Sequence, residues 1–164
     1  MSFSIRRATF DDVETIVTYN LALAWESEAK VLDETVVRAG VLAALTDPIK
    51  GFYVMAEREG EIVGMTAITY EWSDWRNGWY WWIQSVYVRE DARRQGVFTA
   101  IYQHLEAAAT SDPAVIGIRL YVDKDNARAQ ATYQSLGLAD EHYLMMALYP
   151  LPGRPGHIRT SPEA

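Results

Sequence analysis

The side chains best suited to bind an anionic cofactor lie in residues 85–100. Arg93 and Arg94 carry permanent positive charges, and Gly96 lets the backbone come close to a ligand. The apolar spacing that begins a helix directly afterwards runs Val97, Ile101, Leu105 and Ala108. The first N–H groups of a helix have no intrahelical acceptor and lie at the positive end of its dipole. These features together predict a cradle for a pyrophosphate group.

An ordinary strand-to-helix connection with solvated arginines is the competing interpretation, because anion binding at helix N-termini is a general property of helices. Two nucleotide-binding motifs are excluded. Gly96 is followed by Val97 and not by Lys-Ser or Lys-Thr, so the turn is not a Walker loop. It also has one glycine where the dinucleotide fingerprint requires three.

A second candidate pair, Asn126 and Tyr133, lies on a helix predicted over residues 126–136. A separation of seven residues places both side chains on one helix face, about 10 Å apart along the axis. A tyrosine with an ordinary pKa of about 10 keeps its proton at neutral pH and can donate it to a leaving group. Alternatively, Tyr133 belongs with Ala129 and Leu136 to a packing face. Asn126 can serve as the N-cap of the helix in either case.

Two ordered motifs give the chain a family resemblance. Arg93-Arg94-Gln95-Gly96-Val97-Phe98 resembles the acyl-CoA pyrophosphate loop of the GNAT superfamily of N-acetyltransferases, Gln/Arg-x-x-Gly-x-Gly/Ala, with Phe98 where the family usually has Gly or Ala. The segment from Asn126 through Tyr133 to Gly137-Leu138 resembles the family's Asn-x-x-Ala-x-x-x-Tyr-x-x-x-Gly-Phe segment. With the matching order of strands and helices, the resemblance covers roughly residues 3–149.

The resemblance implies acetyl-CoA as co-substrate and direct attack of an amine on its thioester in a ternary complex. Tyr133 would protonate the leaving sulfur, and backbone N–H groups near Val86 would stabilise the oxyanion. The cofactor-binding residues that it implies are Val86, Tyr87, Val88, Arg93, Arg94, Gln95, Gly96, Val97, Phe98, Asn126, Ala129 and Tyr133.

The attacking amine must lose a proton, which requires a carboxylate or an ordered water. Glu26 is the preferred base, because the first two helices of the family line the acceptor side. Glu28, Glu71 and Asp74 are further candidates, and each of the four is alternatively a solvated charge. Gln84 and Ser85 could instead orient a water. The residues predicted to contact the acceptor are Glu26, Glu71, Trp72, Trp82 and Gln84.

Aromatic side chains crowd one predicted hairpin, whose five tryptophans are Trp72, Trp75, Trp79, Trp81 and Trp82. Such rings can form the apolar wall of an acceptor pocket and attract an ammonium group by cation–π interaction. They can equally pack under the helices or form a dimer interface, where aromatic residues are enriched. Spacing alone leaves these three possibilities open.

The elements that must position these residues follow from hydrophobic periodicity, caps and turn signals. Helices are predicted over residues 12–25, 34–45, 95–110 and 126–136, and strands over 3–9, 52–57, 62–72, 79–88, 116–122 and 141–149. The predicted fold class is α/β: a GNAT-like, mostly antiparallel sheet of six to seven strands, flanked by about four helices. Its one parallel pair joins 83–88 to 116–122 and splays apart beyond Val88 and Val122.

Length and composition set the remaining expectations. The 164 residues fit one N-acetyltransferase domain, residues 1–149, and the prolines and glycines that follow predict a flexible tail over 150–164. A net charge of −7 argues against nucleic acid, the absence of cysteine excludes a thiolate nucleophile, and three separated histidines predict no metal. No apolar run reaches the length of a membrane span, so a cytoplasmic location is the default.

These observations lead to one principal functional hypothesis. The protein is expected to be an acetyl-CoA-dependent N-acetyltransferase that acts on a primary amine of a small molecule, with a homodimer left open. The alternatives are a non-catalytic acyl-CoA-binding sensor or interaction module, and an acetyltransferase for protein amino groups.

Overall fold

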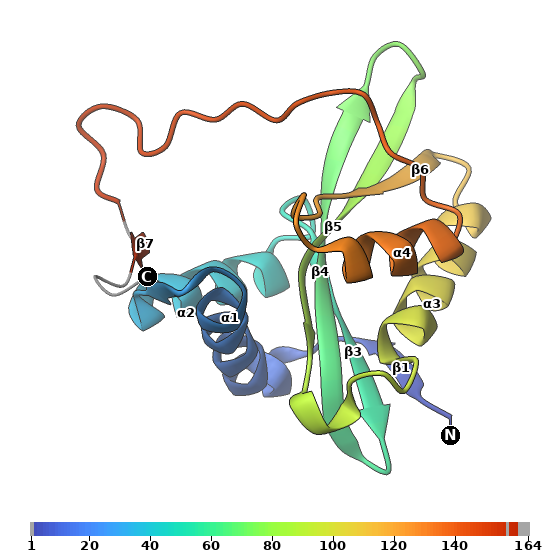
Figure 1. Cartoon of the computed structure of the whole chain (residues 1–164), viewed down its shortest axis with the longest axis horizontal. Coiled ribbons are helices and arrows are strands. Elements are labelled where there is room, and N and C mark those ends of the chain that lie inside the picture. Colours follow the sequence, from blue (N-terminus) through green and yellow to red (C-terminus); the bar gives the residue numbers. More distant parts are fainter. Residues whose placement is uncertain (1, 157, 161–164) are drawn as a thin grey trace.

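The computed structural model describes residues 2–156 and 158–160, and a mixed sheet forms its centre (Figure 1). Every neighbouring pair in this sheet is antiparallel except β5–β6, which is parallel. The α/β fold class with one parallel pair is therefore confirmed. In order across the sheet, the strands are β1 (Ser4–Arg7), β3 (Phe52–Arg58), β4 (Glu61–Ser73), β5 (Gly78–Val88) and β6 (Val115–Leu120).

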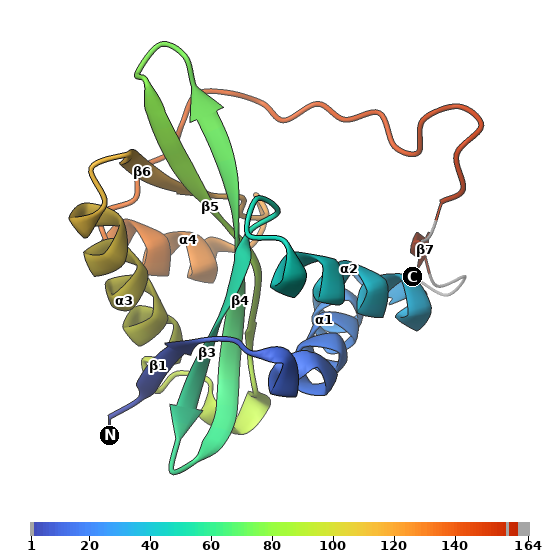
Figure 2. The ribbon, with the colours of Figure 1, turned by 180° about the vertical axis from the view of Figure 1, so that it is seen from behind.

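Four α-helices cover the two faces of the sheet, as the sequence predicts. α1 (Val13–Glu28) and α2 (Glu34–Thr46) lie on one face, and α3 (Val97–Ser111) and α4 (Ala127–Ser135) lie on the other (Figures 1 and 2). Each face has its own apolar core. The core under α1 and α2 includes Ile16, Val17, Val41, Met55 and Met65, whereas that under α3 includes Val54, Ile83, Ile101 and Leu105.

A buried carboxylate fixes the connection from β1 to α1, which passes through the short 3₁₀ helix η1 (Phe10–Asp12). Asp12 accepts hydrogen bonds from the Arg6 guanidinium at 2.8 and 2.9 Å and from the Thr9 N–H at 2.7 Å. The hydrogen bonds from Arg6 lower the pKa of Asp12, although burial opposes them. Asp12 thus joins the first strand to the helix that carries Glu26.

Short turns join the antiparallel strands. Glu59 and Gly60 link β3 to β4 with φ values of 54° and 82°, and Asn77 before β5 has φ 50°. Glycine and asparagine tolerate this left-handed region better than other residues. The turn signals in the sequence therefore predicted both hairpins correctly.

A β-bulge divides β5 into two halves that pair differently with their neighbours. Ser85 has φ 49°, and the register with β4 shifts between Met65 and Ala67. The parallel pairing with β6 ends at Ile83, opposite Leu120. The predicted pairing of 83–88 with 116–122 is therefore wrong in extent: the parallel pair joins residues 79–83 to 115–120 and ends before residue 84, not beyond Val88. Within the described part of the chain, the β6-facing edge of residues 84–88 pairs with no strand.

The C-terminal part of the chain differs from the prediction. Residues 141–149, predicted as a strand, are extended but pair with no strand among the described residues, so the sheet has five strands and not six or seven. The run of apolar residues over 143–149 favours a strand but does not identify its partner. A separate, unpredicted ribbon joins β2 (Lys30–Leu32) to β7 (Ile158–Thr160), which lies within the segment predicted as a tail.

No helix in the described ranges is both long and apolar enough to cross a membrane.

Candidate functional site

The turn between β5 and α3 leaves the start of α3 without a side-chain cap. Its N-cap residue, Gly96, has φ 85° and offers no side chain to the first N–H groups. The N–H of Ala100 is bonded to the Gly96 carbonyl at 3.0 Å, so the amides of residues 97–99 precede the first intrahelical bond. By contrast, side chains of Asp33 and Asn126 cap α2 and α4. The predicted anion cradle therefore has open donors.

The polar side chains of this turn have different tasks. Gln95 donates to the Asp91 carbonyl at 2.8 Å and accepts from Arg58 at 2.7 Å, which fixes the turn. Arg93 donates from Nε to the Val88 carbonyl at 2.9 Å. Arg94 is exposed, and its guanidinium has no partner among the described residues. Of the two arginines in this turn, Arg94 is thus the one whose guanidinium is available to a ligand.

Glu26, near the end of α1, reaches the same turn although it lies 67 residues from Arg93. One of its oxygens forms an ion pair with Arg93, and the other accepts from the Tyr87 hydroxyl at 3.2 Å. The ion pair raises the pKa of Arg93, while burial and then the Glu26 charge raise the pKa of Tyr87. The predicted base and the predicted cofactor loop are therefore in direct contact.

Tyr133 lies beside the first turn of α3. Its ring meets the Phe98 ring edge-on, with 5.2 Å between ring centres. Burial raises the pKa of Tyr133, so its hydroxyl stays protonated at neutral pH, and none of the described residues hydrogen-bonds that hydroxyl. Phe98, which departs from the family pattern, is thus in contact with the predicted acid.

Two other predicted cofactor residues have structural roles that the contacts show directly. The Asn126 side chain accepts from the Ala129 N–H at 3.0 Å, so Asn126 is the N-cap that the sequence allows. Val97 is buried in the core under α3. Val86 and Val88 pack partly against that same core, whereas Tyr87 faces the core under α1.

Three predicted acceptor residues share the sheet face that also carries α1 and α2. Glu71 accepts from the indole N–H of Trp82, and Gln84 donates to the Thr69 hydroxyl at 3.3 Å. Trp72 lies on the opposite face, where its ring meets that of Trp79 with 4.9 Å between centres. Trp72 is therefore not brought together with the other acceptor residues.

The sequence analysis did not identify Arg119 and Tyr121, which lie on the sheet face that carries α1 and α2. Arg119 donates to Glu71 at 2.9 Å and its guanidinium carbon lies 3.7 Å from the centre of the Tyr80 ring. Its Nε is buried and has no hydrogen-bond partner within the described structure. Tyr121 stacks on Trp82 with 4.4 Å between ring centres. The alternation along the strand predicted over 116–122 would have placed both residues on one face.

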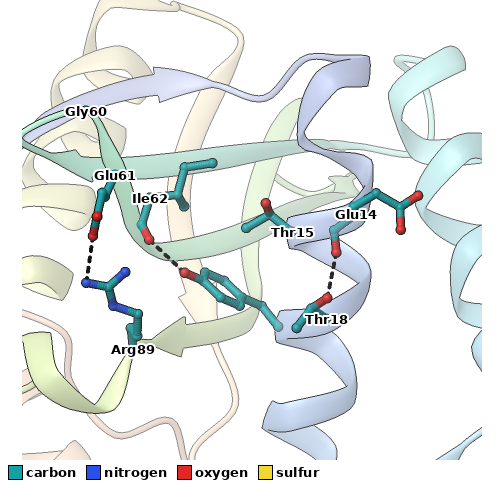
Figure 3. A pocket seen from close by; sticks show the side chains of 8 residues that line it. Glu14, Thr15, Thr18, Gly60, Glu61, Ile62 and Arg89 are labelled. Carbon is teal, nitrogen blue, oxygen red and sulfur yellow. Dashed lines mark hydrogen bonds and ion pairs between the residues drawn. The ribbon is translucent and has the colours of Figure 1, made fainter.

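A shallow pocket of about 450 Å³ lies at the other end of α1 (Figure 3). The Tyr19 hydroxyl donates to the Ile62 carbonyl at 2.7 Å, and Arg89 pairs with Glu61 at 3.1 Å. None of the predicted site residues lines it. The residues that do are Glu14, Thr15, Thr18, Tyr19, Gly60, Glu61, Ile62 and Arg89.

Across the described ranges, no three His, Asp or Glu side chains gather closely enough to hold a metal ion. The candidate site therefore comprises backbone donors, Arg94, the Glu26–Arg93–Tyr87 contact and the Phe98–Tyr133 pair. The Glu71–Trp82–Arg119 cluster lies further along the sheet, on β4, β5 and β6.

Comparisons with solved structures agree with this architecture. A possible acetyltransferase from Clostridium difficile 630 is 41% identical, with a TM-score of 0.84 over 92% of this chain and 99% of that chain. Glucosamine-6-phosphate N-acetyltransferase from Arabidopsis thaliana is 16% identical, with a TM-score of 0.69 over 91% and 99% of the two chains. At such low identity the second similarity shows the fold alone. No curated protein matches the chain.

A model of a known protein family also matches most of this chain. The model of the acetyltransferase (GNAT) family matches residues 17–138, which include the predicted cofactor loop and the segment from Asn126 to Gly137. This match covers most of the chain, and the fold and the similar structure from Clostridium difficile agree with it. The chain therefore belongs to the acetyltransferase (GNAT) family.

Proposed function

We propose that this protein transfers the acetyl group of acetyl-CoA to a primary amine of a small molecule. The observation that carries the proposal is the uncapped start of α3, with Arg94 unpaired beside it within the described structure and the open edge of β5 nearby. Uncapped helix amides and a free guanidinium are suited to phosphate oxygens. An unpaired strand edge is suited to the amide groups of an extended chain.

The residues present fit acetyl-CoA at this position. Apart from its chain neighbours, a Cβ at Gly96 would meet no atom within 4 Å, so the space on that side of the N-cap residue is open. The amides of residues 97–99 and Arg94 would hold the pyrophosphate, and the backbone of Val86 and Val88 would pair with the pantetheine arm. When bound, acetyl-CoA supplies an activated acyl thioester.

Each catalytic role is assigned to a named group of the candidate site. Tyr133 retains its proton and is the proposed acid for the leaving thiolate. Glu26 is the proposed acceptor for the amine proton, and a backbone N–H near Val86 is the proposed oxyanion donor. On the acceptor side, the stacked Trp82 and Tyr121 rings offer an aromatic surface for an ammonium group, whereas the Glu71 carboxylate is already paired with Arg119.

One observation favours the alternative of a non-catalytic acyl-CoA-binding module. Glu26 already forms an ion pair with Arg93 and accepts from Tyr87, so its oxygens are engaged before any substrate binds. A test must therefore separate binding from turnover.

The first measurement is the melting temperature with and without excess acetyl-CoA, with free CoA and NAD as controls. A ligand at a hundred times its dissociation constant stabilises by about 2.7 kcal/mol, which is several degrees for a chain of this size. Thiol release with a panel of small amines then measures turnover. No shift with acetyl-CoA would refute cofactor binding, and a shift without thiol release would favour the binding module.

Tyr133→Phe tests the proposed acid, with Tyr102→Phe as the matched control. Both tyrosine rings lie beside the Phe98 ring, with 5.2 Å between ring centres for Tyr133 and 6.3 Å for Tyr102. Burial raises the pKa of each tyrosine. Loss of a general acid lowers turnover by about 10²-fold or more, whereas acetyl-CoA affinity should stay nearly unchanged. Equal turnover in the two variants would mean that another group or water protonates the thiolate.

A further inference from the structure

The Arg93 side chain holds two groups that the proposed function requires to be available. Its Nε donates to the Val88 carbonyl at 2.9 Å, and its Nη2 forms an ion pair with one oxygen of Glu26. Val88 belongs to the strand edge assigned to the pantetheine arm, and Glu26 is the proposed acceptor for the amine proton. One guanidinium therefore occupies part of the cofactor edge and part of the base at the same time.

The Val88 carbonyl points to the open edge of β5. The N–H of Arg89, the next residue, donates to the Val63 carbonyl in β4 at 2.9 Å. Backbone groups of successive residues in a strand point to opposite sides, so those of Val88 point away from β4. No strand of the described residues pairs with this edge, and Arg93 supplies a donor to its carbonyl instead.

Glu26 has a second partner that keeps it in place. Its other oxygen accepts from the Tyr87 hydroxyl at 3.2 Å, and the Tyr87 ring packs against Tyr19 with 4.7 Å between ring centres. Tyr19 and Glu26 both belong to α1, so the helix that carries the carboxylate also holds its tyrosine partner. The two oxygens of Glu26 therefore differ: Tyr87 fixes one, and Arg93 engages the other.

The ion pair is weak enough to be exchanged for another contact. The Arg93 and Glu26 side chains are 39% and 42% exposed, and ion pairs at such positions contribute little to stability. The backbone around Arg93 is fixed by contrast. The Arg93 N–H donates to the Glu90 carbonyl at 3.2 Å, and the Gln95 side chain donates to the Asp91 carbonyl at 2.8 Å. A change of partner therefore requires rotation of the Arg93 side chain alone.

We propose that Arg93 is a latch that keeps Glu26 from acting as a base until the cofactor edge is occupied, an inference that rests on the proposed function. A ligand amide that pairs with the Val88 carbonyl takes the place of Arg93 Nε. Because Nε and Nη2 belong to one rigid planar group, a displacement that breaks the first bond also moves the second. The released oxygen of Glu26 then accepts the proton that the attacking amine loses, while Tyr87 still holds the other oxygen.

The latch also explains why the base is engaged in the protein before any substrate binds. In the free protein, the pair with Arg93 neutralises the Glu26 carboxylate beside the turn that is proposed to receive the phosphates. With the edge occupied, the same carboxylate is free on the oxygen that faced Arg93. Occupation of the cofactor edge and availability of the base are thus coupled through one side chain.

A double-mutant cycle on acetyl-CoA affinity tests the latch, measured by isothermal titration without an amine. Glu26→Gln removes the charge that holds Arg93, so binding should tighten by about two- to fivefold, the range expected for an exposed ion pair. In Arg93→Met there is no pair to break, so adding Glu26→Gln should leave the affinity unchanged. Glu28→Gln is the matched control, because Glu28 pairs with Lys30, and it should change neither background. Equal tightening in both backgrounds, or none in either, would overturn the latch.

Nuclear magnetic resonance detects the movement of Arg93 itself. The Arg93 Nε–H signal is identified by its loss in Arg93→Lys. A nuclear Overhauser effect between this proton and the Val88 Hα proton should be present in the free protein and absent in the protein saturated with acetyl-CoA. Persistence of the effect at saturation would show that Arg93 stays on the edge, which would refute the proposal.

Failure of the latch and failure of the proposed function give different results. Acetyl-CoA binding and thiol release without the coupling between Glu26 and Arg93 would refute the latch and leave the proposed function intact. Binding and coupling without thiol release would refute acetyl transfer and leave the movement of Arg93 intact. No acetyl-CoA binding by the parent would refute both.

Discussion

Replacing Gly96 with alanine tests whether the uncapped start of α3 is the phosphate cradle. Gly96 has φ 85°, in the left-handed region that costs other residues about 1–2 kcal/mol. No atom lies within 4 Å of the added Cβ, so steric overlap contributes nothing. Alanine lowers the entropy of the unfolded chain, which returns about 0.4–1 kcal/mol. The expected net destabilisation is about 1 kcal/mol, or about 2–4 °C in Tm.

Gly60→Ala is a matched control for this backbone cost. Gly60 has φ 82° in the exposed β3–β4 turn, and a Cβ there also meets no atom within 4 Å. Both variants should therefore lose similar stability. Only at position 96 would the methyl group stand beside the open amides. Impairing one hydrogen bond to a charged group costs about 1.5–3 kcal/mol, so acetyl-CoA should bind Gly96→Ala at least about tenfold more weakly.

Isothermal titration of acetyl-CoA into the parent and both variants measures this difference, and thermal melting without ligand measures the shared backbone cost. Parent-like affinity in Gly96→Ala, together with the expected loss of stability, would show that the turn does not bind the phosphates. The assignment of Arg94 and of the amides of residues 97–99 would then be withdrawn.

Other substitutions probe the site and the scaffold. Glu26→Gln releases Arg93 from its ion pair, so acetyl-CoA should bind more tightly in isothermal titration. Amine turnover should fall at least about tenfold in the same variant. Glu28→Gln should change neither the affinity nor the turnover. Asp12→Asn should lower the unfolding free energy by about 2 kcal/mol in denaturant titration, and Asp11→Asn should have no effect. Because the folded pKa of Asp12 is lowered, its contribution is fully present above its unfolded pKa of about 3.9 and is lost as pH falls through the folded value. Unfolding measured between pH 5 and 2 should therefore depend less steeply on pH in Asp12→Asn.

Local signals were sufficient for much of the scaffold. The Glu59–Gly60 and Asn77–Gly78 dipeptides predicted the two hairpins because Gly60 and Asn77 tolerate the positive φ that these turns contain. Helical spacing and caps predicted the four helices within a few residues. The side chain of Asn126, for example, makes the capping bond that its position before an apolar run indicates.

Local sequence patterns could not predict the contacts between segments that are distant in the chain. The ion pair of Glu26 with Arg93 depends on how α1 packs across β5, which no local pattern encodes. The opposite faces of Trp72 and Trp82 depend on the hairpin register, which pairs Trp72 with Trp79 and Trp82 with Thr69.

The bulge at Ser85 gives the two edges of β5 different dynamics. Towards β4, pairing resumes beyond the bulge through Tyr87 and Val88, so amides on that edge should exchange hydrogen slowly. Towards β6, pairing ends at Ile83, so amides of the next five residues that point that way should exchange quickly. One edge of β5 is thus held by pairing with β4, and the other edge is exposed to solvent. Ligand binding at the exposed edge should slow amide hydrogen exchange there, and only at alternate residues.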